Sequence, residues 1–249
     1  KDGTTIIVDG LFYGDEVLTS INLPDSVEYI GDMAFEDCIN LKKISLPKSL
    51  YTLCDETFLG CESLESVELS EVVNIGVSAF AHCTSLKSII IPESVNQSIS
   101  DSAFLNCTSL EKVTINGDVQ LIGAAAFLNC ENLKSVNIPK SVGYIGADAF
   151  EFCKKLTIKC YENSYAQYYA EENGIKYLLI DEERLVGDIN NDGKIDVNDV
   201  TELQKHLAGY TKADDTPIIA DSDLNIADIT NDGIIDSRDV TALQLSLSE

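Results

Sequence analysis

A repeated unit of about 23 residues constrains this chain more than any other feature, because stacked copies of one short unit fold as a solenoid. Six cysteines mark the copies at intervals of 23, 22, 24, 23 and 23 residues. They are Cys38, Cys61, Cys83, Cys107, Cys130 and Cys153. Each lies three residues after a phenylalanine and three before a leucine, and an alternating apolar segment such as Ile44-Ser45-Leu46 follows. The pattern predicts one coil per copy, with a short strand on a concave face.

The unit reads Val-x-x-Ile-Gly-x-x-Ala-Phe-x-x-Cys-x-x-Leu-x-x-Val-x-Ile-Pro, and a partial copy opens the chain at Leu18 to Pro24. It resembles the BspA-type leucine-rich repeat family over roughly residues 1 to 180. The departures are local: Cys54 and Ser100 replace the glycine, and Ser70 and Asn116 replace the proline. The resemblance implies a leucine-rich-repeat solenoid that is secreted or surface-attached and associated with adhesion and protein binding.

The cysteines of the repeat are predicted to be buried free thiols. Equivalent residues of neighbouring coils lie about 4.8 Å apart with parallel Cβ vectors. A disulfide needs Cβ atoms roughly 3.5–4.5 Å apart and converging, so the ladder is a poor bonding arrangement. A few bridges or a metal are the alternative, although zinc needs four ligands that converge on one point.

One polar column of each strand offers a candidate recognition surface. The residue after each repeat leucine alternates in charge: Lys42, Glu65, Lys87, Glu111 and Lys134. A second column reads Ser45, Glu68, Ile90, Thr114 and Asn137. These columns are interpreted either as a solvated ion-pair ladder or as a polar recognition strip. These columns contain no aromatic cluster of the kind that anchors a sugar or a protein partner, so the sequence does not identify a ligand.

The repeat domain is predicted to span residues 1–180, with a C-terminal cap at 157–180. Ser164 can act as the N-cap of a helix that begins at Tyr165, and Asn173-Gly174 is a typical helix end. An acidic stretch then predicts a linker at 181–186, and residues 187–249 form a second domain.

Two twelve-residue, EF-hand-like loops open the second domain, and 13 of 22 positions are identical between residues 188–209 and 228–249. Calcium wants six to eight oxygen ligands, which alternate residues of such a loop supply around a glycine at position 6. The first predicted ligand set is Asp188, Asn190, Asp192, Lys194 (backbone carbonyl), Asp196 and Asp199. The second is Asp228, Thr230, Asp232, Ile234 (backbone carbonyl), Asp236 and Asp239. Two calcium ions are therefore expected, with a weaker second site at Thr230.

Each loop precedes a helix, and this loop–helix pair is similar to the type I dockerin family over all of residues 187–249. The resemblance implies a small all-α module that binds a cohesin of a scaffoldin in a cellulosome, a complex for polysaccharide degradation. The family's contact positions fall on Val197, Asn198, Lys205, Ser237, Arg238 and Leu245. Because the two halves differ at these positions, one preferred docking orientation is predicted.

The net charge of −25, from 42 acidic and 17 basic residues, argues against nucleic acid and anionic membranes as partners. No apolar run approaches the 18 residues that a membrane span needs. The chain begins Lys1-Asp2-Gly3 with no apolar signal segment, so a signal peptide, if one exists, has been removed or left out.

The predicted fold class is therefore α/β: a mostly β leucine-rich-repeat solenoid followed by an all-α dockerin. The predicted function is that of a non-catalytic, secreted, cellulosome- or cell-surface-associated protein, with repeats that bind protein or mediate adhesion. The alternative is that the repeats regulate or inhibit a cellulosomal enzyme. An enzymatic role ranks last, since His82 and Cys83 lie at neighbouring turn positions that need not converge.

Overall fold

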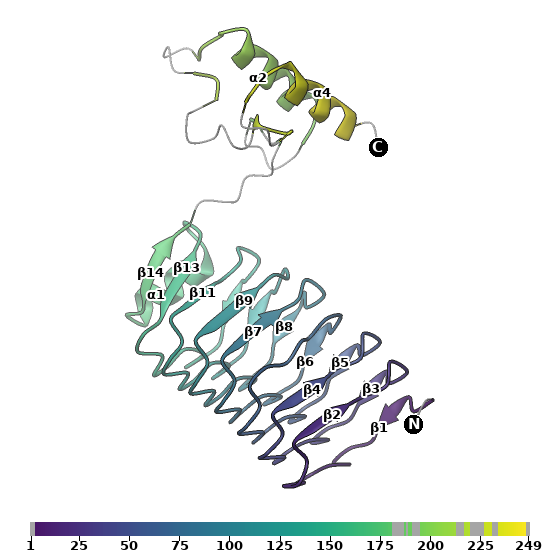
Figure 1. Cartoon of the computed structure of the whole chain (residues 1–249). Coiled ribbons are helices and arrows are strands. Elements are labelled where there is room, and N and C mark those ends of the chain that lie inside the picture. The colour runs from purple at the N-terminus through teal and green to yellow at the C-terminus, as the bar shows by residue number, and fades with distance from the viewer. Residues whose placement is uncertain are drawn as a thin grey trace. The chain divides into compact units, whose positions relative to one another are not determined.

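The computed structural model of the chain describes residues 3–180, 187, 189–190, 195–212, 217–219, 227–230 and 234–247. The chain divides into two compact units, Lys1–Ile180 and Asp181–Glu249 (Figure 1). The first unit is a parallel β-solenoid, and the second carries the helices α2 (Val197–Leu207) and α4 (Ser237–Ser246). This architecture confirms the predicted fold class. The predicted linker, residues 181–186, lies outside the described residues.

One face of the solenoid, here called the back sheet, is a seven-stranded parallel sheet in the order β1-β3-β5-β6-β8-β10-β12. Its strands are β1 (Ile6–Ile7), β3 (Tyr29–Ile30), β5 (Thr52–Leu53), β6 (Asn74–Ile75), β8 (Ser98–Ile99), β10 (Leu121–Ile122) and β12 (Tyr144–Ile145). Pairs such as Ile122 with Ile145 join equivalent residues of adjacent coils. The sequence period therefore sets the register directly.

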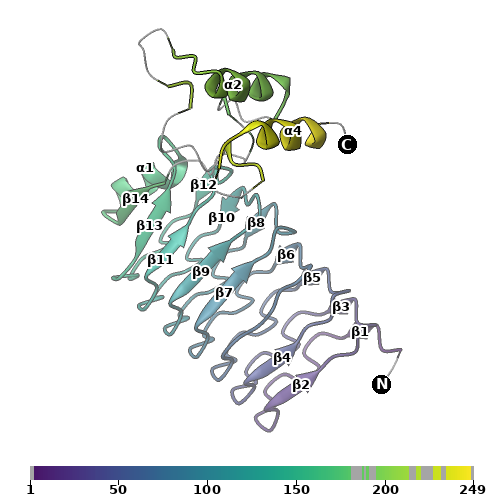
Figure 2. The ribbon, with the colours of Figure 1, turned by 45° about the horizontal axis from the view of Figure 1, so that its top comes forward.

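The opposite face, here called the front face, contains a five-stranded sheet in the order β14-β13-β11-β9-β7 and a separate pair, β2-β4 (Figure 2). Its strands are β2 (Ser20–Asn22), β4 (Lys43–Ser45), β7 (Ser88–Ile91), β9 (Lys112–Ile115), β11 (Ser135–Asn137), β13 (Thr157–Cys160) and β14 (Lys176–Leu179). Alternate residues are buried, as the period of two requires: in β7, Ile89 and Ile91 face the core while Ile90 faces solvent.

A column of stacked phenylalanines runs along the solenoid axis. Successive ring centroids lie 5.0–5.4 Å apart, with interplanar angles of 3–17°. The members are Phe12, Phe35, Phe58, Phe80, Phe104, Phe127 and Phe150. Phe12 was not predicted as a member, because its coil lacks the cysteine and the Ile-Gly pair. It nevertheless lies 23 residues before Phe35, a spacing that could have revealed it.

All eight cysteines are free, which confirms the predicted thiols. In the repeat, each Sγ–H donates to the carbonyl of the phenylalanine one coil earlier, with sulfur–oxygen distances of 3.0–3.2 Å. Burial raises the pKa of Cys38 to about 11 and that of Cys107 to about 12. Cys38 and Cys107 therefore stay protonated, and the cysteines of the repeat act as packing groups and hydrogen-bond donors.

Two turns in each coil use the left-handed backbone conformation. The turn before the cysteine has φ of 55–72° at Asp37, Gly60, His82, Asn106, Asn129 and Phe152. Glycine, asparagine and aspartate adopt this conformation most readily, which explains most of the residue types found there. His82 thus occupies a structural turn: its Nε2 lies 3.4 Å from Asn106 Nδ2, while the Cys83 thiol donates to the Phe58 carbonyl. The two residues share no contact of a catalytic pair.

The earlier turn of each coil predicts a stabilising substitution. Ala125 has φ of 54°, and the equivalent residue of the first coil is Gly10 with φ of 58°. Because a left-handed alanine is strained, we expect Ala125→Gly to raise the free energy of unfolding by about 0.5–1 kcal/mol in urea titrations. The neighbouring Ala126 is fully buried, so Ala126→Gly should lower it. Equal losses for both variants would contradict the strain.

The helix α1 (Tyr165–Glu172) and β14 cover the last coil. Ser164 is the N-cap, as predicted: its side chain accepts from the Gln167 N–H, and Gly174 follows the helix with φ of 65°. Tyr169 packs edge-on against Phe150, at a centroid distance of 6.2 Å. The helix therefore buries the end of the phenylalanine column.

Candidate calcium-binding unit and interaction surfaces

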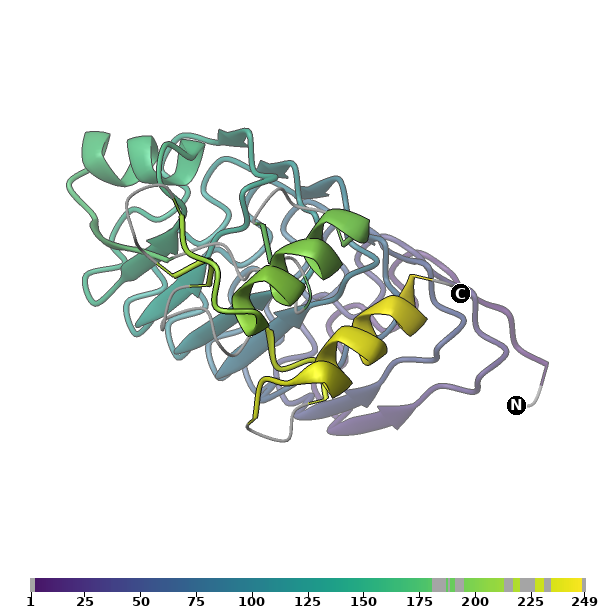
Figure 3. The same cartoon turned by 90° about the horizontal axis from the view of Figure 1, so that it is seen from above.

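The C-terminal unit is built around helices α2 and α4, which pack against each other (Figure 3). Each begins with a reciprocal capping box, formed by Asp196 with Asp199 and by Asp236 with Asp239. The apolar core contains Ile189, Val200, Leu203, Ile219, Ala227, Val240 and Leu243. Val200 with Leu203 and Val240 with Leu243 are separated by three residues, so each helix presents one apolar stripe to its neighbour.

The last predicted ligand of each loop holds two other loop positions in place. Asp199 Oδ1 accepts from Asn190 N–H at 3.0 Å, and its Oδ2 accepts from Asp196 N–H at 2.7 Å. Asp239 repeats both contacts, with Thr230 N–H at 3.0 Å and Asp236 N–H at 2.8 Å. The internal sequence repeat is thus an internal structural repeat, with loop positions 3, 9 and 12 joined in both copies.

Asp199 and Asp239 are fully buried carboxylates. Burial alone would raise the pKa of Asp239, but the hydrogen bonds from Asp236 and Thr230 lower it below the usual value. The hydrogen bonds from backbone N–H groups hold both carboxylates as acceptors at the start of a helix. Carboxylate, amide, hydroxyl and backbone oxygens are the donor set that a hard cation such as calcium prefers, so the residue types fit that ion.

The structure describes only some residues of each predicted ligand set. Asn190, Asp196 and Asp199 of the first set are described, as are Asp228, Thr230, Ile234, Asp236 and Asp239 of the second. Asp188, Asp192, Lys194 and Asp232 lie outside the described residues. Among the residues that are described, no group of three or more His, Cys, Asp or Glu side chains is arranged to hold a metal ion. The ligand sets remain predictions.

The two loops differ at position 11. Arg238 of the second loop binds the Asp236 carboxylate, with Nη2 to Oδ2 at 2.7 Å and Nε to Oδ2 at 3.0 Å. The hydrogen bonds from Arg238 lower the pKa of Asp236. The first loop has Asn198 at this position, which carries no charge. Sequence reasoning named both residues but did not predict this ion pair.

The residues predicted to contact a cohesin are all exposed. The apolar side chains of Val197 and Leu245 are 68% and 63% exposed. Lys205 pairs with Glu202 at 2.6 Å. Asn198, Ser237 and Arg238 are also exposed, at the first turns of the two helices. This exposure leaves the predicted contact positions accessible within the unit.

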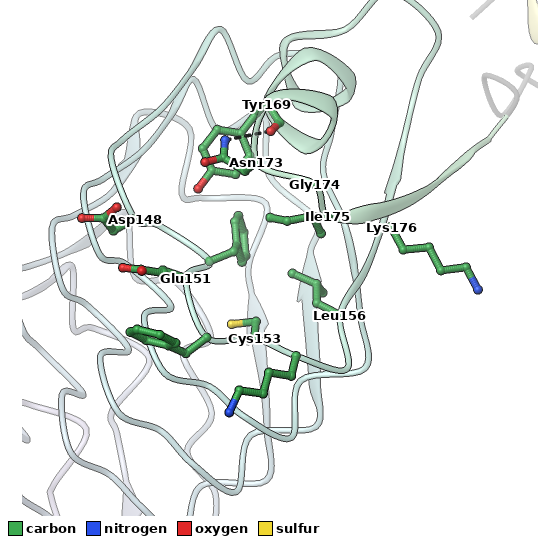
Figure 4. A pocket seen from close by; sticks show the side chains of 12 residues that line it. Asp148, Glu151, Cys153, Leu156, Tyr169, Asn173, Gly174, Ile175 and Lys176 are labelled. Carbon is green, nitrogen blue, oxygen red and sulfur yellow. Dashed lines mark hydrogen bonds between the residues drawn. The ribbon is translucent and has the colours of Figure 1, made fainter.

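A pocket of about 590 Å³ lies between the last coil and α1 (Figure 4). Its lining combines two acidic and two basic residues with aromatic rings such as those of Phe150 and Tyr169; the charged residues are Asp148, Glu151, Lys154 and Lys176. Asn173 Nδ2 donates to the Tyr169 carbonyl across one end, at 2.8 Å. The pocket was not predicted, because it forms where a segment that breaks the period meets the last repeat. Its opposite charges select no single ligand class.

The predicted charge ladder on the front face forms in part. Lys134 Nζ lies 2.5 Å from Glu111 Oε2, and this contact lowers the pKa of Glu111. Both side chains are more than half exposed, so the pair stabilises the fold by little. Ile90, the apolar member of the second column, is 58% exposed.

These features define a leucine-rich-repeat solenoid joined to a loop–helix module, and comparison with known proteins identifies both parts. The family model described as BspA type leucine rich repeat region matches residues 5–97 and 97–171, in six copies. The chain belongs to this family. The model of the dockerin type I domain matches residues 186–248. Among curated proteins, none matches this chain.

One solved structure in particular supports the solenoid fold. A leucine rich cell surface protein from Faecalibacterium prausnitzii A2-165 is 32% identical, with a TM-score of 0.56, over 63% of this chain and 43% of that protein. The chain thus spans less than half the length of this relative. A leucine rich repeat protein from T. pallidum is 25% identical, with a TM-score of 0.47, over 59% of this chain and 82% of that one.

The family assignments carry general consequences. A dockerin implies cohesin binding and calcium binding, and leucine-rich repeats imply protein–protein interaction. Both are non-catalytic families. In the described part of the chain, no helix is long and apolar enough to cross a bilayer.

Proposed function

We propose that this chain is a non-catalytic, secreted component of a cellulosome-type complex. Its C-terminal unit attaches it to a cohesin of a scaffoldin, and its repeats present a surface for protein binding or adhesion. The observation that carries the proposal is the pair of loop–helix units, in which Asp199 and Asp239 make the same two backbone contacts. Residues 1–180, 181–186 and 187–249 are then the repeat domain, the linker and the anchoring domain.

Two calcium ions are part of the proposal. The first is held by Asp188, Asn190, Asp192, Lys194, Asp196 and Asp199, and the second by Asp228, Thr230, Asp232, Ile234, Asp236 and Asp239. Bound calcium supplies the positive charge that lets these oxygens crowd together. Residues 187–249 hold 14 acidic and only 4 basic side chains, so bound calcium would reduce the repulsion between carboxylates in this unit. Calcium-dependent folding also suits an extracellular setting.

Attachment is tested by capture of the full chain on a panel of cohesins, with calcium and with a chelator. We expect capture by at least one cohesin that chelation abolishes. Calcium-independent capture, or none from any cohesin of the panel, would remove the basis of the proposal. A second pull-down with the full chain from cellulosome-bearing cultures separates the roles of the repeats. Recovery of wall or cell-surface components supports adhesion, and recovery of an inhibited enzyme supports the regulatory alternative.

We expect a single docking orientation, because the two candidate contact sets differ in charge and size. One set is Val197, Asn198 and Lys205, and the other is Ser237, Arg238 and Leu245. Alanine substitution of the preferred set should weaken cohesin binding by about 30-fold or more, as for interface anchors, while the other set changes it less than threefold. Calorimetry on both triple variants measures this difference. If neither triple variant binds weakly and only the sixfold variant does, two orientations are in use.

A further inference from the structure

The strand ladder of the front face is interrupted at one coil. Within residues 3–180, Ser66 forms an isolated bridge with Lys43, but residues 66–70 form no ladder pair with β7. β7 is therefore an edge strand inside the solenoid, although coils flank it on both sides. The interruption lies within the shortest repeat, in which Cys61 and Cys83 are 22 positions apart. It also contains Ser70, which replaces the repeat proline and has φ of 22°.

Where the ladder is interrupted, the surface of the front face is hollowed, but the two neighbouring coils remain in contact. At one end, Lys87 N–H donates to the Glu65 carbonyl at 3.4 Å; at the other, Ser94 Oγ donates to the Val72 carbonyl at 2.7 Å. Leu69 remains buried beneath it. The two coils are thus held together on both sides of a pocket of about 560 Å³. This volume lies within the range of roughly 300–1,000 Å³ that ligand pockets occupy.

The lining of this pocket has one sign of charge. Glu68, Glu71 and Glu93 contribute three carboxylates, and no lysine or arginine is among the lining residues. Elsewhere on the front face acidic and basic residues alternate, and Lys134 pairs with Glu111. Ile90 adds an exposed apolar side chain to the same pocket. The pocket therefore combines carboxylate acceptors with an apolar wall.

We propose that this front pocket receives an arginine side chain from an extended, basic segment of a protein partner. A guanidinium matches carboxylates with a planar fork of donors, and its aliphatic stem can pack on Ile90. A single buried arginine is a common anchor of protein interfaces. The charge of the lining decides for a basic partner and against an acidic or anionic one. The inference deepens the proposed protein-binding role of the repeats and does not depend on the cohesin.

The experiment titrates the calcium-loaded full chain with N-acetyl-arginine methylamide and follows backbone amide shifts by NMR. We expect saturable shifts confined to residues 66–71 and 88–94, and none with the norleucine analogue, which lacks the guanidinium. The double variant Glu68→Gln and Glu93→Gln should weaken binding about fivefold or more. The matched control, Glu28→Gln and Glu131→Gln, removes the same charge from exposed sites elsewhere and should change it less than twofold.

Ile90→Ser tests the apolar wall of the pocket without changing the net charge. It should weaken binding of the arginine compound about threefold, although every carboxylate is still in place. Unsaturable shifts spread over the acidic surface would overturn the proposal, as would equal losses in the test and control pairs. Cohesin capture of the Glu68→Gln and Glu93→Gln variant should be unchanged. Failure of the pocket is thereby distinguished from failure of the proposed attachment.

Discussion

Chelation of calcium from the full chain is expected to unfold the C-terminal unit and leave the solenoid intact. The unit has a small apolar core, and it buries the Asp199 and Asp239 carboxylates completely. Without a cation, the negative charge of each loop is left crowded and partly desolvated, which is strongly unfavourable. Calcium at 1,000 times its dissociation constant stabilises a folded state by about 4 kcal/mol per site, a large share of the stability of a domain this small.

The measurement is far-UV circular dichroism of the full chain during a chelator titration. The helical signal of α2 and α4 should disappear and return when calcium is added in excess. The thermal transition of the solenoid should not move, because the repeats contain no such loop. The double variant Asp199→Ala and Asp239→Ala should resemble the chelated protein even in calcium. A helical signal that ignores the chelator would contradict the coupling of metal binding to folding.

Truncation of one ring in the phenylalanine column is expected to destabilise the solenoid by about 3–5 kcal/mol. Phe80 is fully buried and stacks on Phe58 and Phe104, at centroid distances of 5.3 Å on both sides. Phe80→Ala therefore removes two stacking contacts and leaves a cavity between coils that are fixed by their strand pairs. Urea unfolding of the first unit, followed by its β signal, measures the loss.

Phe152 provides the matched control, since it is 53% exposed and has a left-handed φ of 61°. Phe152→Ala should change the free energy of unfolding by less than about 0.5 kcal/mol, as surface substitutions usually do. If Phe80→Ala costs no more than Phe152→Ala, the column does not contribute the expected packing energy.

The solenoid could be predicted from sequence because its register equals its period. Once Cys38 to Cys153 are aligned, the buried positions of the repeated coils follow, including the alternation that exposes Ile90. The two loop–helix units could also be predicted from the sequence, because Asp196 and Asp236 belong to local motifs that begin each helix. In both cases the interactions that matter lie within one repeat or between identical residues of adjacent repeats.

The features that escaped prediction depend on how unlike segments meet. The ladder interruption at residues 66–70 depends on how a short coil with Ser70 lies against the next one, which no single repeat encodes. The pocket beneath α1 forms between the last coil and a segment outside the period. The Arg238–Asp236 ion pair depends on the side-chain rotamer of Arg238. The first loop has Asn198 at the equivalent position, so comparison of the two loops could not predict the pair.

The thiol-to-carbonyl contacts have a consequence for how such a molecule can change in length. Each cysteine of the ladder is satisfied by a peptide oxygen of the preceding coil and needs no second sulfur. A coil can therefore be inserted or deleted, in odd or even number, without orphaning a cysteine. Folds that are cross-linked by disulfides lack that freedom, because the loss of one cysteine leaves its bonding partner unpaired.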